Sequence, residues 1–235
     1  MFIHFTNGNI FHIFQNIIDA LNKGNIPLWF VNSLVVTIFS LIVSTIVSAL
    51  AAYALARFRF AGRVLFFNSM IALMVIPPAV LILPLFVLMV NVGLINTLTS
   101  VIIIYSGLLI PFSVYLLVSF FRSLPPELFD AAAIDGCSNL DTFWRITLPL
   151  STPAMVTLVV VNALFVWNEL FIALVFLQGE SVMTLMPGLT LFKGHFTVNE
   201  PLVMAGTLIA TVPMILLYLF GQRLFVEGLV AGAVK

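Results

Sequence analysis

Long apolar runs, separated by shorter polar stretches, dominate the chain, and five of them are long enough to cross a bilayer. A hydrocarbon core of about 30 Å needs roughly 20 helical residues. The runs cover residues 29–56, 64–90, 97–121, 153–177 and 201–225. None of them alternates polar and apolar positions as the strands of a membrane barrel do. The pattern therefore predicts an all-α, polytopic membrane protein with about five transmembrane helices.

Composition supports a membrane protein and excludes several other classes. Only 8% of the residues are charged and 62% are hydrophobic, whereas soluble domains carry about 25% charged residues. Net charge is zero and the basic residues form no stripe along one segment, so nucleic acid is not expected as a partner. The scattered histidines and the single cysteine have no neighbours at metal-ligand spacing, which predicts no metal site and no enzyme activity: His4, His12, His195 and Cys137.

Basic residues predict the orientation. Seven of the nine lie between the first and second runs, between the third and fourth runs or at the C-terminal end, and Lys23 and Lys193 lie on the other side. By the positive-inside bias, the first group faces the cytoplasm, the N-terminus lies outside and the C-terminus inside. We accordingly expect an extracytoplasmic amphipathic lead-in over 1–28, a transmembrane domain over 29–227 and a cytoplasmic tail over 228–235.

Prolines interrupt the second apolar run. Pro77, Pro78 and Pro84 each remove a helix hydrogen bond, so we expect this helix to bend in mid-membrane. A bend there fits a gating role. Proline is also simply commoner in membrane helices than in soluble ones, and the sequence leaves both interpretations open.

The loop over 122–149, called the acidic loop below, differs from the other connections. It holds four of the nine acidic residues of the chain. Pro125 and Pro126 favour the start of a short helix, and Gly136 favours a left-handed stop. Ser138 and Asp141 have the spacing of a capping box, which predicts a second helix that ends at Pro149.

Its composition suits a groove in another protein. Ala131, Ala132 and Ala133 allow close approach of the first helix, and the flanking carboxylates could pair with basic residues. The alternative is a solvated connection between two spans.

The acidic loop resembles the signature of permeases of ABC importers. Their pattern is Glu-Ala-Ala, then a glycine, then Ile-x-Leu-Pro, and the chain differs only in having aspartate at the first position. The matching residues are Asp130, Ala131, Ala132, Gly136, Ile146, Leu148 and Pro149. The resemblance implies an ATPase-coupling loop that comprises Glu127, Asp130, Ala131, Ala132, Asp135, Gly136, Arg145, Ile146, Leu148 and Pro149.

Other motifs resemble the carbohydrate branch of these permeases, of the maltose-permease G-subunit type. They are Asn32-Ser33-Leu34, the stretch 52–58, Trp167-Asn168-Glu169, Gln222-Arg223 and the C-terminal stretch 228–235. Members of this branch usually have six spans. The resemblance therefore implies either that an N-terminal span is cut from this sequence, which we favour, or that this member works with a five-helix core.

The resemblance also implies the partners. They are a cytoplasmic ATPase dimer, a second homologous permease subunit, an extracytoplasmic solute-binding protein, membrane lipid and a sugar substrate, all at the cell (inner) membrane. ATP would be bound by the partners, since the chain has no G-x-x-x-x-G-K-[ST] loop and we expect no cofactor. A permease for a polyol, glycerol phosphate, amino acid or peptide is the alternative, and a non-transport membrane protein would leave the acidic loop unexplained.

Glu169 is the one acidic residue well inside an apolar run, where a carboxylate is costly. With Trp167 and Asn168 it is a candidate for lining the solute path. The alternative is an anchor at the membrane interface, where tryptophan is common. Neither the sugar nor the subunit that holds its pocket follows from the sequence.

Overall fold

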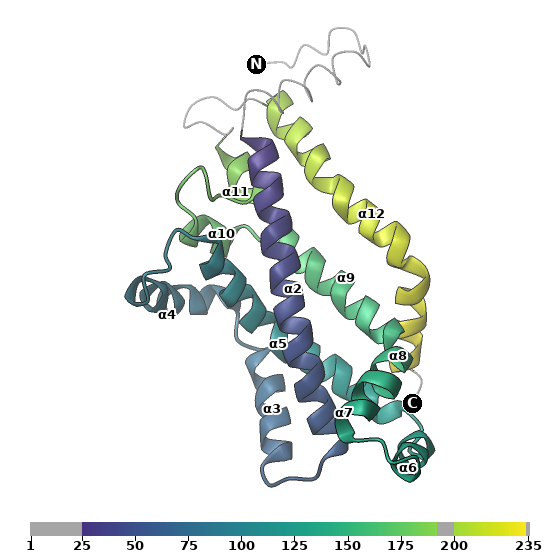
Figure 1. The fold of residues 1–235 in the computed structure, drawn as a ribbon. Coiled ribbons are helices and arrows are strands. Elements are labelled where there is room, and N and C mark those ends of the chain that lie inside the picture. Colours follow the sequence, from purple (N-terminus) through teal and green to yellow (C-terminus); the bar gives the residue numbers. More distant parts are fainter. Residues whose placement is uncertain (1–24, 192–199, 234–235) are drawn as a thin grey trace.

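The computed structural model describes residues 25–191 and 200–233, in which all regular structure is helical (Figure 1). Helix α2 (Ile26–Arg57) packs along much of its length against α5 (Leu98–Ser123) and leaves an apolar face exposed on the other side. At 1.5 Å per residue these two helices are about 48 and about 39 Å long, and both are apolar enough to cross a bilayer unbroken. The predictions for 29–56 and 97–121 are therefore confirmed.

Helices α2 and α5 pack closely along a row of small hydroxyl residues. On α2 these recur every three or four positions and are buried: Ser33, Thr37, Ser40, Ser44 and Ser48. The Ser40 hydroxyl donates to the carbonyl of Ile102 at 3.4 Å. The Ser106 hydroxyl donates to the Ile102 carbonyl in its own helix at 2.6 Å and lies 3.5 Å from the carbonyl of Ser40. Small side chains let two membrane helices approach closely, so this row holds the centre of the bundle.

The second apolar run is two helices, not one. Helix α3 (Arg63–Leu73) and helix α4 (Pro78–Asn91) meet at an angle of 102°. The bend that the prolines predicted is confirmed, and it falls at residues 74–77 because Pro77 and Pro78 supply no N–H. Pro84 lies inside α4. The run from 64 to 90 therefore forms a bent pair of helices that together are apolar and long enough for one broken span.

The fourth apolar run is also broken. Helix α9 (Thr152–Asn168) ends before Glu169, and helix α10 (Phe171–Phe176) follows. The Glu169 carboxylate accepts hydrogen bonds from the N–H groups of Ile172 at 3.0 Å and Ala173 at 3.2 Å, and from the Tyr105 hydroxyl at 2.6 Å. The prediction of one helix over 153–177 is therefore wrong. The helix can break here because the Glu169 carboxylate satisfies the free N–H groups at the start of α10.

The remaining helices enclose this frame. Helix α12 (Glu200–Ala233) packs along α9 and is longer than the predicted span 201–225. It continues into the predicted tail. Helix α11 (Leu185–Thr190) is tied to α2, because Asn32 donates to the carbonyl of Met183 at 2.9 Å and the Ser33 hydroxyl accepts from the N–H of Leu185 at 2.8 Å.

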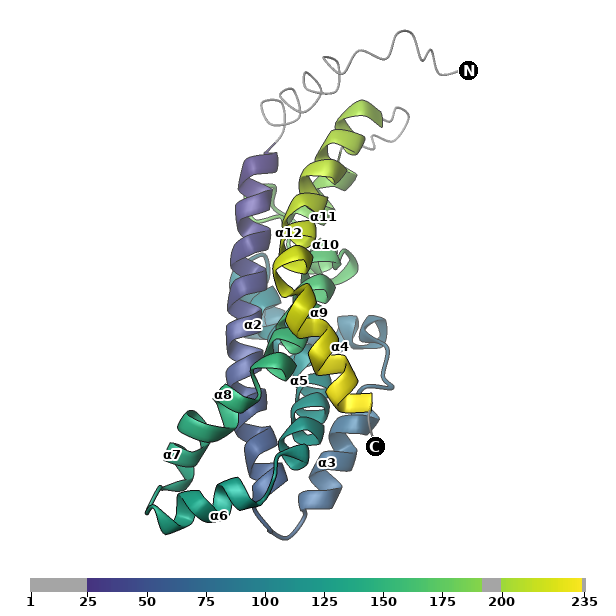
Figure 2. The same cartoon turned by 90° about the vertical axis from the view of Figure 1, so that its right-hand side faces the viewer.

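The helices of the acidic loop stand apart from the bundle, beside the end of α2 (Figure 2). They are α6 (Glu127–Ile134), α7 (Asn139–Thr142), the π-helical turn η1 (Phe143–Thr147) and α8 (Leu148–Leu150). Most of the predicted lead-in lies outside the described residues, as do Lys23, Lys193 and the three histidines.

Tyr105→Phe tests the partner of Glu169. The substitution removes one hydrogen bond to a carboxylate, which should lower the free energy of unfolding by about 1.5–3 kcal/mol. Tyr115→Phe is the matched control on the same helix, because Tyr115 is exposed and its hydroxyl makes no described hydrogen bond. The measurement is thermal unfolding of the purified complex in detergent, and equal losses in both variants would contradict this role of Tyr105.

Gly188→Ala tests the seat of α11 on α2. A Cβ atom at this position would overlap the ring of Trp29, and overpacking of this kind costs about 1–3 kcal/mol. Gly107→Ala in α5 meets nothing within 4 Å and should raise helix stability by about 0.5–1 kcal/mol. A Gly188→Ala protein that unfolds at the wild-type temperature would refute the packing.

Candidate functional site

The first helix of the acidic loop begins and ends by local rules. Glu127 and Asp130 lie in its first turn, where carboxylates suit the positive end of a helix. At the other end, the N–H of Cys137 bonds to the carbonyl of Ala132 at 2.9 Å and that of Gly136 to Ala133 at 3.2 Å. This is a Schellman motif, and Gly136 has the left-handed φ of 74° that it needs. The predicted stop is confirmed.

The second helix begins at the predicted capping box. The N–H of Asp141 donates to the Ser138 hydroxyl at 3.2 Å, and the N–H of Ser138 donates to the Asp141 carboxylate at 3.2 Å. Hydrogen bonds from Ser138 lower the pKa of Asp141 below its usual value. Arg145 pairs with Asp141 at 3.6 Å, an exposed contact that adds little stability.

The end of this helix differs from the prediction. Helical structure continues past Pro149 to Leu150, and the chain then turns by 74° into α9. In the π turn before it, the N–H of Leu148 bonds to the carbonyl of Phe143, five residues back. The wider turn places Pro149, which has no N–H, in the helix. Ile146, Leu148 and Pro149 thus lie on the segment that joins the acidic loop to α9.

Two aromatic side chains fix the acidic loop to α2. Phe143 is 1% exposed, and its ring centroid lies 5.2 Å from that of Tyr53. The guanidinium of Arg57 lies over the ring of Phe129, 2.9 Å from its centroid. The sequence did not indicate the contacts of Phe129 and Phe143 with α2. Phe129 could have been found as the large aromatic residue in an otherwise alanine-rich and acidic helix.

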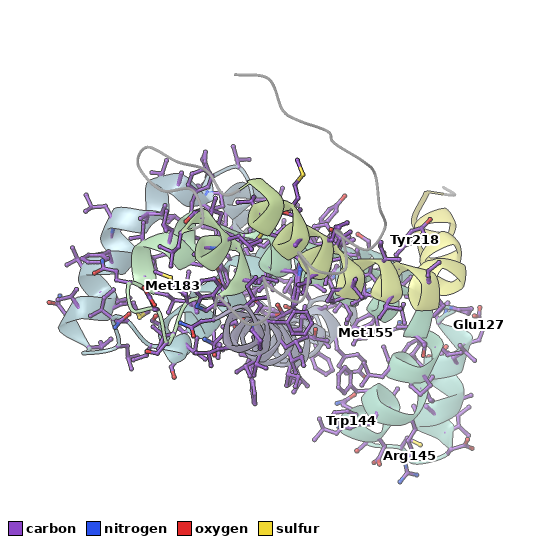
Figure 3. The ribbon with its side chains drawn as sticks, turned by 90° about the horizontal axis from the view of Figure 1, so that it is seen from above. Glu127, Trp144, Arg145, Met155, Met183 and Tyr218 are labelled. Carbon is purple, nitrogen blue, oxygen red and sulfur yellow. The ribbon has the colours of Figure 1, made fainter. Side chains whose placement is uncertain are left out.

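The outer face of the acidic loop is uncovered and mixes apolar with acidic residues. Ile134, Leu140 and Trp144 are 86%, 64% and 60% exposed. Figure 3, seen from above, places Glu127, Trp144 and Arg145 on the part of the ribbon that stands outside the bundle. Asp130, Ala131 and Asp135 are also exposed, whereas Ala132 is buried. Exposed apolar side chains rimmed by charge are typical of a protein interface.

The three candidates for lining a solute path lie apart from this face. Trp167 is buried, and its indole N–H donates to the carbonyl of Ala210 on α12 at 2.9 Å. Asn168 is exposed and donates back to Leu164 at 2.8 Å. Glu169 occupies the break described above. Within this chain Trp167 and Glu169 hold helices together, and their part in a solute path stays a prediction.

A cavity of about 670 Å³ opens where α3 and α4 meet, against α5 and α9. Its lining is almost wholly apolar and includes Pro78, Gly107, Pro111 and Phe165, with Asn162 as a polar side chain. Asn162 donates to the Ser113 hydroxyl at 2.9 Å. No sequence motif indicated this cavity, because its residues come from four separate segments. No cluster that could bind a metal occurs among the residues that the structure describes.

Comparisons with known proteins identify a matching family and several similar proteins. The family described as binding-protein-dependent transport system inner membrane component matches residues 44–229. The probable ABC transporter permease protein YurM of Bacillus subtilis is 36% identical over 94% of this chain and 73% of its own length. The melibiose/raffinose/stachyose import permease protein MelC of the same organism is 36% identical over 94% of this chain and 81% of its own length.

Solved structures agree with this placement. A bacterial ABC transporter involved in the import of the acidic polysaccharide alginate matches with a TM-score of 0.79 and 25% identity, over 90% of this chain and 79% of that one. The prediction of an ABC importer permease is confirmed, and so is a multi-pass membrane protein. The chain therefore belongs to the family of inner membrane components of binding-protein-dependent transport systems, as a permease subunit of an ABC importer.

Proposed function

We propose that this chain is one of two permease subunits in an importer for an oligosaccharide, and that its acidic loop receives the motion of a partner ATPase dimer. The observation that carries this proposal is the form of the acidic loop. Its outer face leaves Ile134 and Trp144 uncovered, while its inner side is fixed to α2 through Phe129 and Phe143. A partner that moves this element must therefore also move α2.

The choice of substrate rests on relatives. MelC is named for melibiose, raffinose and stachyose, and the AraQ protein of Halalkalibacterium halodurans, 36% identical over 88% of this chain and 74% of its own length, for arabinooligosaccharides. Another solute is the second candidate, since the SmoH protein of Agrobacterium fabrum, named for sulfoquinovosyl glycerol, is 34% identical. A thermal-shift screen of sugars on the cognate solute-binding protein separates these two candidates.

The orientation follows from the arginines. Arg57, Arg59, Arg63, Arg122 and Arg145 all lie at or beside the end of the bundle that carries the acidic loop. This end faces the cytoplasm by the positive-inside bias. The ATPases, which bind the ATP, dock here. The solute-binding protein docks at the opposite end, where α11 and the start of α2 lie.

The second permease subunit covers the face around the cavity. All ten residues from 71 to 80 are exposed in this chain, including the whole break between α3 and α4. Irregular backbone at membrane depth is tolerated where protein or a water-filled cavity covers it, not where it faces lipid. The solute path then lies between the two subunits, and the broken helices rock it between inward-facing and outward-facing states.

Gly136→Val tests the acidic loop as a lever. A β-branched residue at a left-handed φ of 74° costs about 1–2 kcal/mol, and relief of this strain would disrupt the Schellman motif between the two helices. We expect ATP hydrolysis to continue while transport per ATP falls at least several-fold in proteoliposomes that contain the whole importer.

Gly93→Val is the matched control for strain. Gly93 has a φ of 70° with nothing within 4 Å, as Gly136 does, but it lies between α4 and α5, away from the acidic loop. The Gly93→Val protein should lose as much thermal stability as Gly136→Val but keep the wild-type ratio of transport to ATP hydrolysis. Normal coupled transport in Gly136→Val would refute the lever.

Phe129→Ala tests the contact that links the acidic loop to α2. Without the ring beneath it, Arg57 loses a cation–π contact worth about 1 kcal/mol, roughly a fivefold change in an equilibrium. The number of solute molecules transported per ATP should therefore fall about fivefold. Leu128→Ala is the control in the same helix, since Leu128 is exposed. Equal coupling ratios in the two variants would show that the contact transmits nothing.

A further inference from the structure

A hollow of about 550 Å³ lies between the α2–α3 loop, the start of α3 and the end of α5. Three arginines line it: Arg59 and Arg63 from the connection between α2 and α3, and Arg122 from the end of α5. The other lining residues are Phe60, Gly62, Val64 and Leu65, so no carboxylate faces the hollow. Three like charges that converge on one concave surface repel one another, and an anion bound there would offset that repulsion.

These guanidinium groups are mostly unpaired within the described part of the chain. Arg63 donates to the carbonyl of Phe58 at 3.2 Å and Arg122 to that of Leu55 at 3.5 Å. Leu55 lies in the last turn of α2 and Phe58 directly follows this helix, so these carbonyls position the two arginines and leave their other N–H donors available. The guanidinium of Arg122 also lies over the ring of Phe67, 5.2 Å from its centroid. Arg59 makes no hydrogen bond or ion pair there. Arg145, in contrast, has Asp141 as its partner.

The rim of the hollow is apolar and exposed. Val64 and Leu65 are 70% and 73% exposed, and Phe60 is 48% exposed. Val64 and Leu65 lie in the first turn of α3, which has no buried residue and packs mainly against α5. Because α2 and α5 both end beside the hollow, it lies at the depth where the hydrocarbon core meets water. A small soluble anion would make no contact with this apolar rim. A molecule with a charged head and hydrocarbon chains would contact both the arginines and the rim.

We propose that Arg59, Arg63 and Arg122 form a binding site for the headgroup phosphate of an anionic phospholipid. Arginine forks bind phosphate oxygens through paired charge-assisted hydrogen bonds, and basic pockets between membrane helices bind lipid headgroups. The acyl chains lie along Val64 and Leu65. The bound lipid braces α3 against α5, which its own packing holds only weakly. This lipid site does not depend on the orientation proposed above. The orientation decides only the leaflet from which the lipid comes, which would be the cytoplasmic one.

The test uses the whole importer in nanodiscs that contain phosphatidylglycerol and phosphatidylcholine. A mild detergent then releases the importer together with the lipids that stay bound. Native mass spectrometry measures how much of each lipid stays bound. For the double variant Arg63→Gln with Arg122→Gln we expect about a tenfold loss of phosphatidylglycerol, because two charge-assisted contacts are removed. Arg145→Gln, which neutralises a paired arginine at the same end, should change retention by less than about twofold.

Two further variants separate a lipid from other occupants. Val64→Ser with Leu65→Ser should weaken retention of phosphatidylglycerol while competition by inorganic phosphate stays unchanged. Unchanged retention in this pair, or displacement of the lipid by inorganic phosphate alone, would overturn the proposal in favour of a small-anion site. If the double arginine variant releases the ATPase but keeps its lipid, an acidic surface of the ATPase occupies the hollow instead, and the proposal is also wrong.

The remaining outcomes are equally decisive. A tenfold loss in Arg145→Gln as well would mean that diffuse positive charge, not this hollow, attracts the lipid. Thermal unfolding without added phosphatidylglycerol checks that each variant is folded, and Arg63→Lys with Arg122→Lys gives a charge-preserving version that should keep an intermediate amount of lipid. Lipid retention does not depend on transport, so its result is independent of the substrate and of the lever in the acidic loop.

Discussion

The close packing of α2 against α5 is the contact on which the rest of the structure depends. In lipid, two apolar helices gain little from hydrophobic burial, so van der Waals contact and interhelical hydrogen bonds must hold them. The hydroxyl row from Ser33 to Ser48 allows that contact. Several other elements attach to one of these two helices, whereas α12 packs mainly against α9. Helix α11 attaches to Asn32 and Ser33, helix α3 to α5, and the acidic loop to Tyr53 and Arg57.

Breaks in the apolar helices need internal partners for their free amides, because the hydrocarbon core supplies no water. Glu169 serves this purpose between α9 and α10. Asn96 does the same at a connection between helices, with a left-handed φ of 59° and a side-chain oxygen that accepts from the N–H groups of Gln178 and Gly179. The presence of Glu169 in an apolar run is therefore explained by the backbone N–H groups that it satisfies, without any role in transport.

The sequence predicted those features that local rules determine. Apolar runs located α2 and α5. Single residues located the stop and the start within the acidic loop, since the hydrogen bonds at Gly136 and Ser138 span only three to five positions. Hydropathy could not find the break at Glu169, because both sides of it are equally apolar. The contacts of Phe129 with Arg57 and of Phe143 with Tyr53, and the cavity beside α4, join distant segments. Only the folded chain brings these together.

The corner between α6 and α7 has a consequence for assembly. A Schellman stop at Gly136 is followed directly by the capping box at Ser138, and both rely on hydrogen bonds within a few residues. The shape of this corner is thus encoded in about ten residues and exists before any partner arrives. An ATPase that meets it binds a preorganised surface and bears little entropic cost of ordering a flexible segment. Assembly of such a complex should resemble the rigid docking of two finished surfaces more than folding upon binding.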